Sequence, residues 1–229
     1  MAEFVHPIGK IRGKYGNLIG YMGANGKNYC KGSAITRKSG GEPQKRQSVA
    51  FGTTVQGKKW MAKAVRLGFP GGNGYPKGFN GFISANVMNA ITVEKIDPEK
   101  PLSPRKKATR EFQGTIDYEK LRVAAGQLVI PVVGVEVDTN NRKVSFTSRG
   151  IPVEAVDCFL DDKIYGVILD ENKQRCRVGE LGTRGESINT SMDFPDEVEE
   201  ADGIIVYVFA ASADGKDVSD SVCLWKPTK

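Results

Sequence analysis

The chain contains one histidine, His6, which lies close to the N-terminus. Hydrolases with a Ser-His-Asp or Cys-His arrangement need a histidine held beside the nucleophile, and here they would depend on a terminal residue. Among the 27 acidic residues, nothing singles out a pair with the roles of glycosidase carboxylates. The sequence therefore predicts a protein that is not an enzyme.

Cysteine is also scarce, and its four residues are far apart with no C-x-x-C spacing: Cys30, Cys158, Cys176 and Cys223. This spacing excludes a recognisable zinc ribbon or dense disulfide framework and favours reduced, mostly buried thiols. The acid-rich stretch 193–202 lacks the EF-hand pattern, which favours a solvated loop over a calcium site. We expect neither a metal nor a cofactor.

Nucleotide-binding motifs are missing as well. The pair Gly26-Lys27 ends a glycine-rich run, but Tyr21 and Asn28 occupy the places where a phosphate-binding loop needs its first glycine and its Ser or Thr. No apolar run is long enough for a signal peptide core or a membrane span. The expectation is a protein made and kept in the cytosol, or carried in a particle assembled there, with no membrane partner.

What the sequence does contain is a division of charge. Residues 1–112 hold 20 Lys+Arg and 6 Asp+Glu, a balance of +14, whereas residues 113–229 hold 13 and 21, a balance of −8. Such a split predicts one part that meets a polyanion or an acidic neighbour and another that repels such partners. We predict two domains, a basic N-terminal arm and helical docking region over 1–125 and an acidic domain over 126–229.

The basic half opens with a segment, 9–32, in which glycines, cations and tyrosines alternate closely. It predicts short extended pieces joined by tight turns, with Asn25-Gly26 as a hairpin signal. A polar linker is expected over 36–47. Helical spacing of apolar residues then predicts one helix over 48–67 and a second over 79–91, followed by a basic loop over 97–110.

The acidic half shows short alternating strands at intervals typical of an immunoglobulin-like or fibronectin-like β-sandwich. The continuous apolar run 204–211 predicts a strand covered on both faces. The fold class predicted for the whole chain is α+β. The expected strands cover 127–137, 142–148, 154–161, 163–170, 174–181, 187–193, 203–211 and 219–226.

Several motifs carry a family resemblance that covers nearly the full chain. They are GKIRGKYGNLIGY, NGKNY, QKRQ, FNGFISANVMNAIT and IDYEKLRVAAGQL, with matching positions Gly13, Gly16, Asn17, Gly20, Phe82, Asn86, Asp117 and Tyr118. Their layout resembles an uncharacterised family from gut commensal bacteria and their phages. The resemblance carries no catalytic residues, and it implies a non-enzymatic, often phage-associated protein with a β-sandwich joined to a Gly/Lys-rich head.

Two functions stay open. The first is a structural or auxiliary virion protein, capsid-associated or a decoration protein, that docks through its basic half onto other virion proteins or copies of itself. The second is a nucleic-acid-binding protein in which cations contact phosphates and tyrosines stack on bases. Both hypotheses predict the same contact residues: Lys10, Arg12, Lys14, Tyr15, Tyr21, Lys27, Tyr29, Lys31, Arg37, Lys38, Lys45, Arg46, Lys58, Lys59, Arg105, Lys106 and Lys107.

Overall fold

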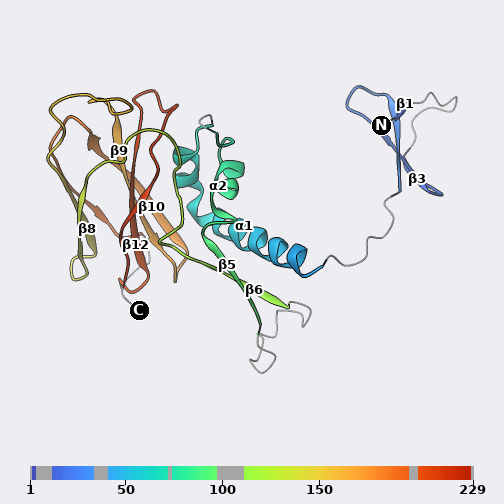
Figure 1. Cartoon of the computed structure of the whole chain (residues 1–229), viewed down its shortest axis with the longest axis horizontal. Helices are drawn as coiled ribbons and strands as arrows, with labels where there is room; N and C mark the ends of the chain where they lie inside the picture. Colours follow the sequence, from blue (N-terminus) through green and yellow to red (C-terminus); the bar gives the residue numbers. More distant parts are fainter. Residues whose placement is uncertain are drawn as a thin grey trace. The chain divides into compact units, whose positions relative to one another are not determined.

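The chain forms two compact units, residues 1–44 and residues 45–229 (Figure 1). The computed structural model describes residues 2–3, 12–33, 41–71, 74–96, 111–195 and 201–227. The sequence placed the boundary between domains at 125/126, but the compact units divide between Gln44 and Lys45. The helical region belongs with the C-terminal strands because both contribute side chains to one hydrophobic core.

Unit 1 is a small antiparallel sheet with strand order β1-β4-β3-β2. The predicted hairpin is confirmed, since the Asn25-Gly26 turn joins β3 to β4 and Gly26 has the positive φ, 77°, that such turns require. Gly16, with φ 58°, closes the turn between β2 and β3. The strands are β1 (Ala2–Glu3), β2 (Gly13–Tyr15), β3 (Leu18–Met22) and β4 (Asn28–Gly32).

Unit 2 begins with the long helix α1 (Glu42–Gly68). It starts six residues earlier than predicted, because Glu42 and Pro43 suit the first turn of a helix and the polar segment expected as a linker continues into it. Helix α2 (Phe79–Asn86) is shorter than predicted. Its expected last turn gives way to the strand β5 (Ile91–Lys95), whose β-branched residues pair well in a ribbon.

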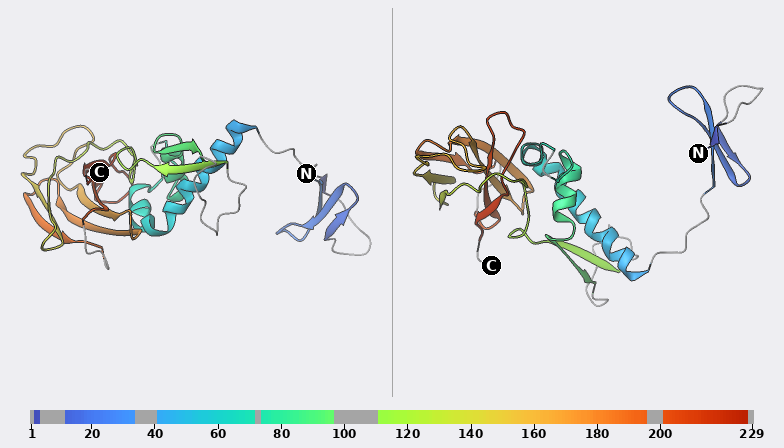
Figure 2. Two further views of the ribbon diagram at one scale, coloured as in Figure 1. Left: turned by 90° about the horizontal axis from the view of Figure 1, so that it is seen from below. Right: turned by 45° about the horizontal axis from the view of Figure 1, so that its top comes forward.

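The strand β5 pairs with β6 (Phe112–Ile116), forming a two-stranded antiparallel ribbon that the sequence did not predict. Figure 2 shows this ribbon running beside the N-terminal half of α1. Lys45 Nζ lies 2.9 Å from a Glu111 carboxylate oxygen, and Arg46 Nη1 donates to Val93 O at 3.1 Å. The basic loop predicted over 97–110 lies outside the described residues.

The C-terminal strands form two antiparallel sheets, with orders β10-β9-β12-β13 and β11-β8-β7, so the chain has an α+β fold. The predicted strands over 142–148, 163–170, 174–181, 187–193 and 203–211 are confirmed within two residues at each end. The strands are β7 (Gly134–Asp138), β8 (Lys143–Ser148), β9 (Lys163–Asp170), β10 (Arg175–Thr183), β11 (Ile188–Asp193), β12 (Ile204–Ala211) and β13 (Val222–Trp225).

Two predictions of strands were wrong. Residues 127–133 are irregular apart from one bridge at Leu128, and only the end of the predicted strand 127–137 becomes β7. Pro131, which cannot donate a backbone hydrogen bond, interrupts that segment. The predicted strand 154–161 is a loop containing an isolated bridge between Ala155 and Cys158. The prediction of a strand in both segments rests on their alternating hydrophobic residues.

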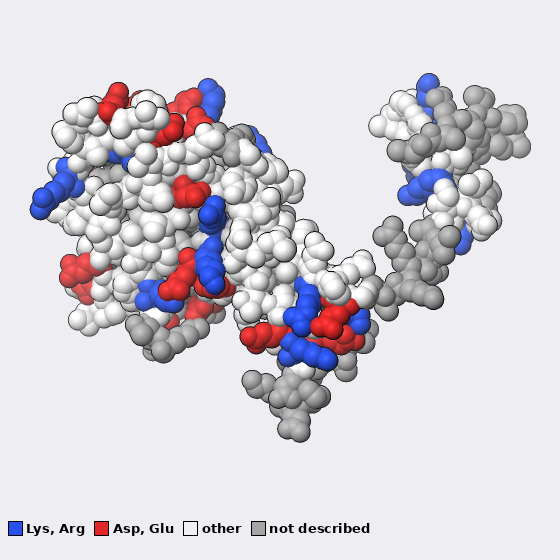
Figure 3. Space-filling view, in the orientation of Figure 1, with Lys and Arg blue, Asp and Glu red and all other residues white. Residues whose placement is uncertain are grey.

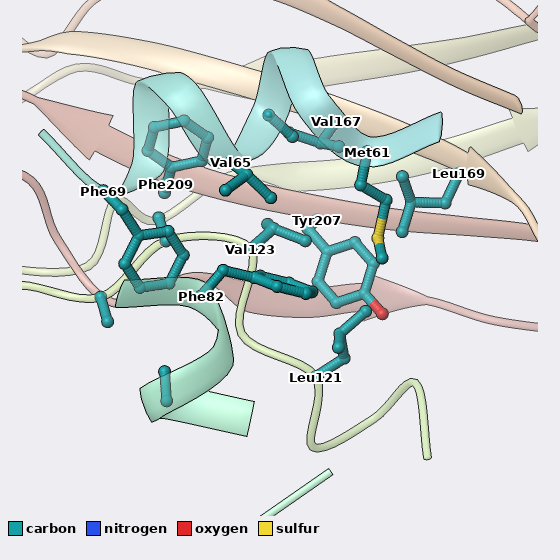
Figure 4. Close-up of a cluster of buried hydrophobic side chains, with 14 of the residues drawn as sticks. Met61, Val65, Phe69, Phe82, Leu121, Val123, Val167, Leu169, Tyr207 and Phe209 are labelled. Carbon is teal, nitrogen blue, oxygen red and sulfur yellow. The ribbon is translucent and has the colours of Figure 1, made fainter. Parts of the chain in front are cut away.

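Unit 2 has two hydrophobic cores, one on each face of the four-stranded sheet. The first fills the space between the two sheets and includes Phe146 from β8 and Ile168 from β9. The second lies between the other face and the helices, where Met61 and Val65 of α1 meet Tyr207 of β12 (Figure 4). Every residue of β12 is buried, which confirms the prediction that this strand is covered on both faces.

Candidate functional site

Strand pairing in unit 1 gathers five of its side chains on one face of the sheet. Lys14 pairs with Ile19, Ile19 pairs with Lys31, and Tyr21 pairs with Tyr29. Because side chains alternate between the two faces of a strand, these five residues share a side, and the pairing of Glu3 with Tyr29 adds one acidic position to it. The two tyrosine rings stack with centroids 5.8 Å apart, and Lys31 Nζ lies 5.7 Å from the Tyr21 centroid. We call this surface the basic tyrosine face.

The opposite face of the same strands is different in character. The residues that β3 and β4 place on this face are all uncharged. They are Leu18, Gly20, Met22, Asn28, Cys30 and Gly32. The β3–β4 turn fixes one tyrosine, since Asn25 Nδ2 donates to Tyr29 Oη at 2.7 Å while Asn25 Oδ1 accepts from Lys27 N at 3.1 Å. The alternation therefore separates a cationic, aromatic side from a neutral one.

The remaining predicted contact residues are distributed between the units. Arg12, before β2, and Lys59, on α1, are exposed. Lys45 and Arg46 hold the β5–β6 ribbon against α1, where Arg46 also lies over the Phe112 ring at 4.8 Å. For Tyr15 in β2 and Lys58 in α1 the structure describes the backbone only. Those outside the described residues are Lys10, Arg37, Lys38, Arg105, Lys106 and Lys107.

The side chains of the basic tyrosine face are groups that bind partners by charge and by aromatic contact. The basic tyrosine face presents two ammonium groups and two phenols, which suit contact with an acidic surface or a phosphate chain. In the part of the chain that the structure describes, no three His, Cys, Asp or Glu side chains are grouped as a metal site would need. Burial raises the pKa of the Cys176 thiol to about 12 and also raises that of Cys223, which keeps both protonated at neutral pH.

A second surface lies at one end of the two sheets, where a buried ion pair holds three segments together. Arg184 Nε donates to Asp162 Oδ2 at 3.1 Å, and both side chains are almost fully buried. Arg184 Nη2 donates to Val129 O at 2.7 Å, and Asp162 Oδ2 also accepts from Phe159 N at 3.1 Å. The pair thus joins the segment 127–133 to the β8–β9 loop.

These segments leave large hydrophobic side chains in solvent. Val132 is 89% exposed, Val156 84% and Val153 72%. A cavity of about 520 Å³ opens beside Val132, between the segment 129–132, the end of β8 and Arg184. Surfaces of this kind on a folded domain mark interaction sites more often than chance. We define the apolar loop patch as Val129, Ile130, Val132, Val153, Val156, Phe159 and Leu160.

Sequence reasoning missed this patch because all of its residues except Val153 were assigned to the predicted strands 127–137 and 154–161, and the structure forms loops at these positions. Pro131 within the first of these runs was the available signal, since proline is disfavoured inside a paired strand. The buried ion pair between Asp162 and Arg184 could not be predicted from a local sequence pattern, because 22 positions separate the two residues. Figure 3 shows acidic and basic side chains at this end of unit 2, with uncharged surface between them.

Comparison with known proteins adds no assignment. No protein-family model matches the chain, and no curated protein matches it in sequence. Among the described residues, no helix has both the length and the apolar character needed to cross a membrane.

Proposed function

We propose that the chain is a non-enzymatic structural or auxiliary protein of a larger assembly, which docks through unit 1 and displays unit 2. The observation that carries this proposal is the basic tyrosine face, where strand register collects Lys14 and Lys31 around Tyr21 and Tyr29. Tyrosine is enriched at protein interfaces, and lysine stems cover apolar surface while their charges reach an acidic partner. The setting in a phage particle rests on the family resemblance of the sequence motifs.

The displayed part is proposed to be an immunoglobulin-like or fibronectin-like sandwich. Support comes from strand order, since β7, β8 and β11 match strands A, B and E of such folds, while β9, β12 and β13 match C, F and G. The strand β10 then joins the edge beside C. A sandwich of this kind positions loops at its ends without requiring chemistry, which suits a display role.

The docking proposal is tested with the full chain and a labelled poly-L-glutamate probe. The double variant Lys14→Glu/Lys31→Glu reverses the charge of the face, and we expect the dissociation constant to rise about tenfold or more at low salt. The control Lys77→Glu/Lys173→Glu makes the same change in net charge on exposed positions of unit 2 and should bind like the wild type. Equal binding by the face variant and the wild type would refute the proposal.

Nucleic-acid binding is the second candidate, favoured by the tyrosine rings on the cationic face. A single-stranded oligonucleotide replaces poly-L-glutamate in the same titration. If bases stack on the rings, Tyr21→Leu should weaken oligonucleotide binding by about five- to tenfold or more while leaving poly-L-glutamate binding unchanged. Equal small effects on both probes would favour the acidic protein surface as the partner.

A further inference from the structure

The apolar loop patch sits within an acidic end of unit 2. The loops 149–162, 184–187 and 212–221 together contain 3 Lys+Arg and 8 Asp+Glu, a balance of −5. They lie close to the segment 127–133, since Leu128 N donates to Val218 O at 3.1 Å and Val129 N donates to Asp157 O at 2.8 Å. The surface therefore combines exposed aliphatic side chains with surrounding negative charge.

Unit 1 has the complementary pattern. Residues 1–44 contain 7 Lys+Arg and 2 Asp+Glu, a balance of +5. The basic tyrosine face places Ile19 and two stacked rings beside the ammonium groups of Lys14 and Lys31. Apolar contact at the centre with opposite charges around it is the usual composition of a protein–protein interface.

Chain length limits docking within one copy, because the segment before α1 would have to be almost fully extended along the helix. Helix α1 has 27 residues and is therefore about 40 Å long. Its C-terminal end is the one close to the loops, because Gly68 O accepts from Ala125 N at 3.2 Å, and in Figure 1 its N-terminal end points away from the two C-terminal sheets. Lys31 is 11 positions from Glu42, a separation that spans at most about 40 Å when fully extended.

We propose that the apolar loop patch is the docking site for unit 1 of a second copy of this chain. The inference rests on the proposed function, because it uses the same basic tyrosine face and names its partner. Each copy then has one donor surface and one acceptor surface, so the contact is heterologous. Such a contact generates a ring where the rotation closes and an open chain of subunits where it does not.

Sedimentation velocity of the full chain over a range of concentrations tests this proposal. We expect reversible self-association that weakens about tenfold or more between about 50 mM and about 500 mM NaCl, as screening of the charges requires. Val132→Glu should remove the acceptor surface, and Lys14→Glu/Lys31→Glu should remove the donor surface, so each variant alone should be monomeric. Circular dichroism checks that both remain folded.

The decisive sample is the mixture of these two variants. Each retains one surface that the other lacks, so the mixture should form a one-to-one dimer and nothing larger. Met88→Glu replaces another strongly exposed apolar residue of unit 2, 77% exposed, and should associate like the wild type. A mixture that stays monomeric would overturn the head-to-tail contact.

The remaining outcomes separate this inference from the proposed function. A wild type that stays monomeric but binds poly-L-glutamate through its basic tyrosine face overturns the second copy as partner and leaves the docking function standing. Loss of poly-L-glutamate binding as well overturns both. A compact wild-type monomer that expands on Val132→Glu would indicate docking within one chain, which also contradicts the proposal.

Discussion

The side chain of Asn86 joins helix α2 by hydrogen bonds to the segment that leads into the sheets. Its removal should lower the free energy of unfolding by an amount that can be worked out from these bonds. Asn86 is fully buried. Its Nδ2 donates to Arg122 O at 2.8 Å and to Phe82 O at 2.9 Å, while its Oδ1 accepts from Arg122 N at 2.7 Å. The amide therefore satisfies both backbone groups of Arg122 as a neighbouring strand would.

Asn86→Ala leaves the N–H and C=O of Arg122 without these partners. Each unsatisfied group in a buried position costs about 1–3 kcal/mol, and because Arg122 is half-buried we expect a loss of about 3 kcal/mol in all. The matched control is Asn89→Ala, since Asn89 is exposed and its Nδ2 donates only to Ala85 O at 2.9 Å among the described contacts. Water can replace that bond, so its loss should cost less than about 1 kcal/mol.

Urea unfolding followed by tryptophan fluorescence measures both variants, because Trp60 and Trp225 each pack against a core of unit 2. A third variant, Asn86→Asp, keeps an oxygen that accepts from Arg122 N. Its second carboxyl oxygen replaces Nδ2 and lies beside the carbonyl oxygens of Phe82 and Arg122. Burial favours its protonated form, so its stability relative to wild type should be lower at pH 7 than at pH 4. Equal losses for Asn86→Ala and Asn89→Ala would falsify the assigned role of this side chain.

Two further predictions concern helical glycines and alkaline pH. Gly52→Ala should stabilise unit 2 by about 0.5–1 kcal/mol, because a Cβ at this position meets no atom within 4 Å. Gly81→Ala should destabilise unit 2 by about 1–3 kcal/mol, because its Cβ would lie 2.1 Å from Pro76 O. Urea unfolding that shows the same sign for both variants would contradict this reasoning. Burial raises the pKa of Cys176 to about 12 from 9.0 and that of Tyr118 to about 12 from 10.0. The unfolded chain ionises first, so these two groups should not change the free energy of unfolding below about pH 8 and should lower it as the pH rises toward 12, by at most about 1.4 kcal/mol per pH unit for Cys176. A pH series of urea midpoints with Cys176→Ala as control measures that share, and a flat profile above pH 9 in the wild type would count against it.

Local signals in the sequence predicted much of the secondary structure. The alternation of apolar and polar residues identified the strand pattern of β8, and the continuous apolar run identified β12. Asn25-Gly26 identified a hairpin because a tight turn needs a residue tolerant of positive φ. In each case the determining interaction lies within a few residues of the chain.

Other features depended on contacts distant in sequence and could not be predicted in the same way. The ribbon β5–β6 forms because the strands pair across an intervening segment and rest on α1. The segments 127–133 and 154–161 contain hydrophobic residues that predicted strands, yet they form loops at the end of the sheets, where Arg184 Nη2 donates to Val129 O and Asp162 Oδ2 accepts from Phe159 N. An apolar composition alone does not distinguish a buried strand from an exposed interaction surface.

The sequence by itself determined the division of charge, the cation- and tyrosine-rich head and the all-buried strand β12, because composition and short-range periodicity are properties of the linear chain. Only the tertiary structure decided that the helices share a core with the sheets, that the compact division falls between Gln44 and Lys45, and that Lys14, Lys31 and the two tyrosines share a face. The physical reason is register: strand pairing and core packing join residues far apart in sequence, and a shift of one residue would move those side chains to the opposite face.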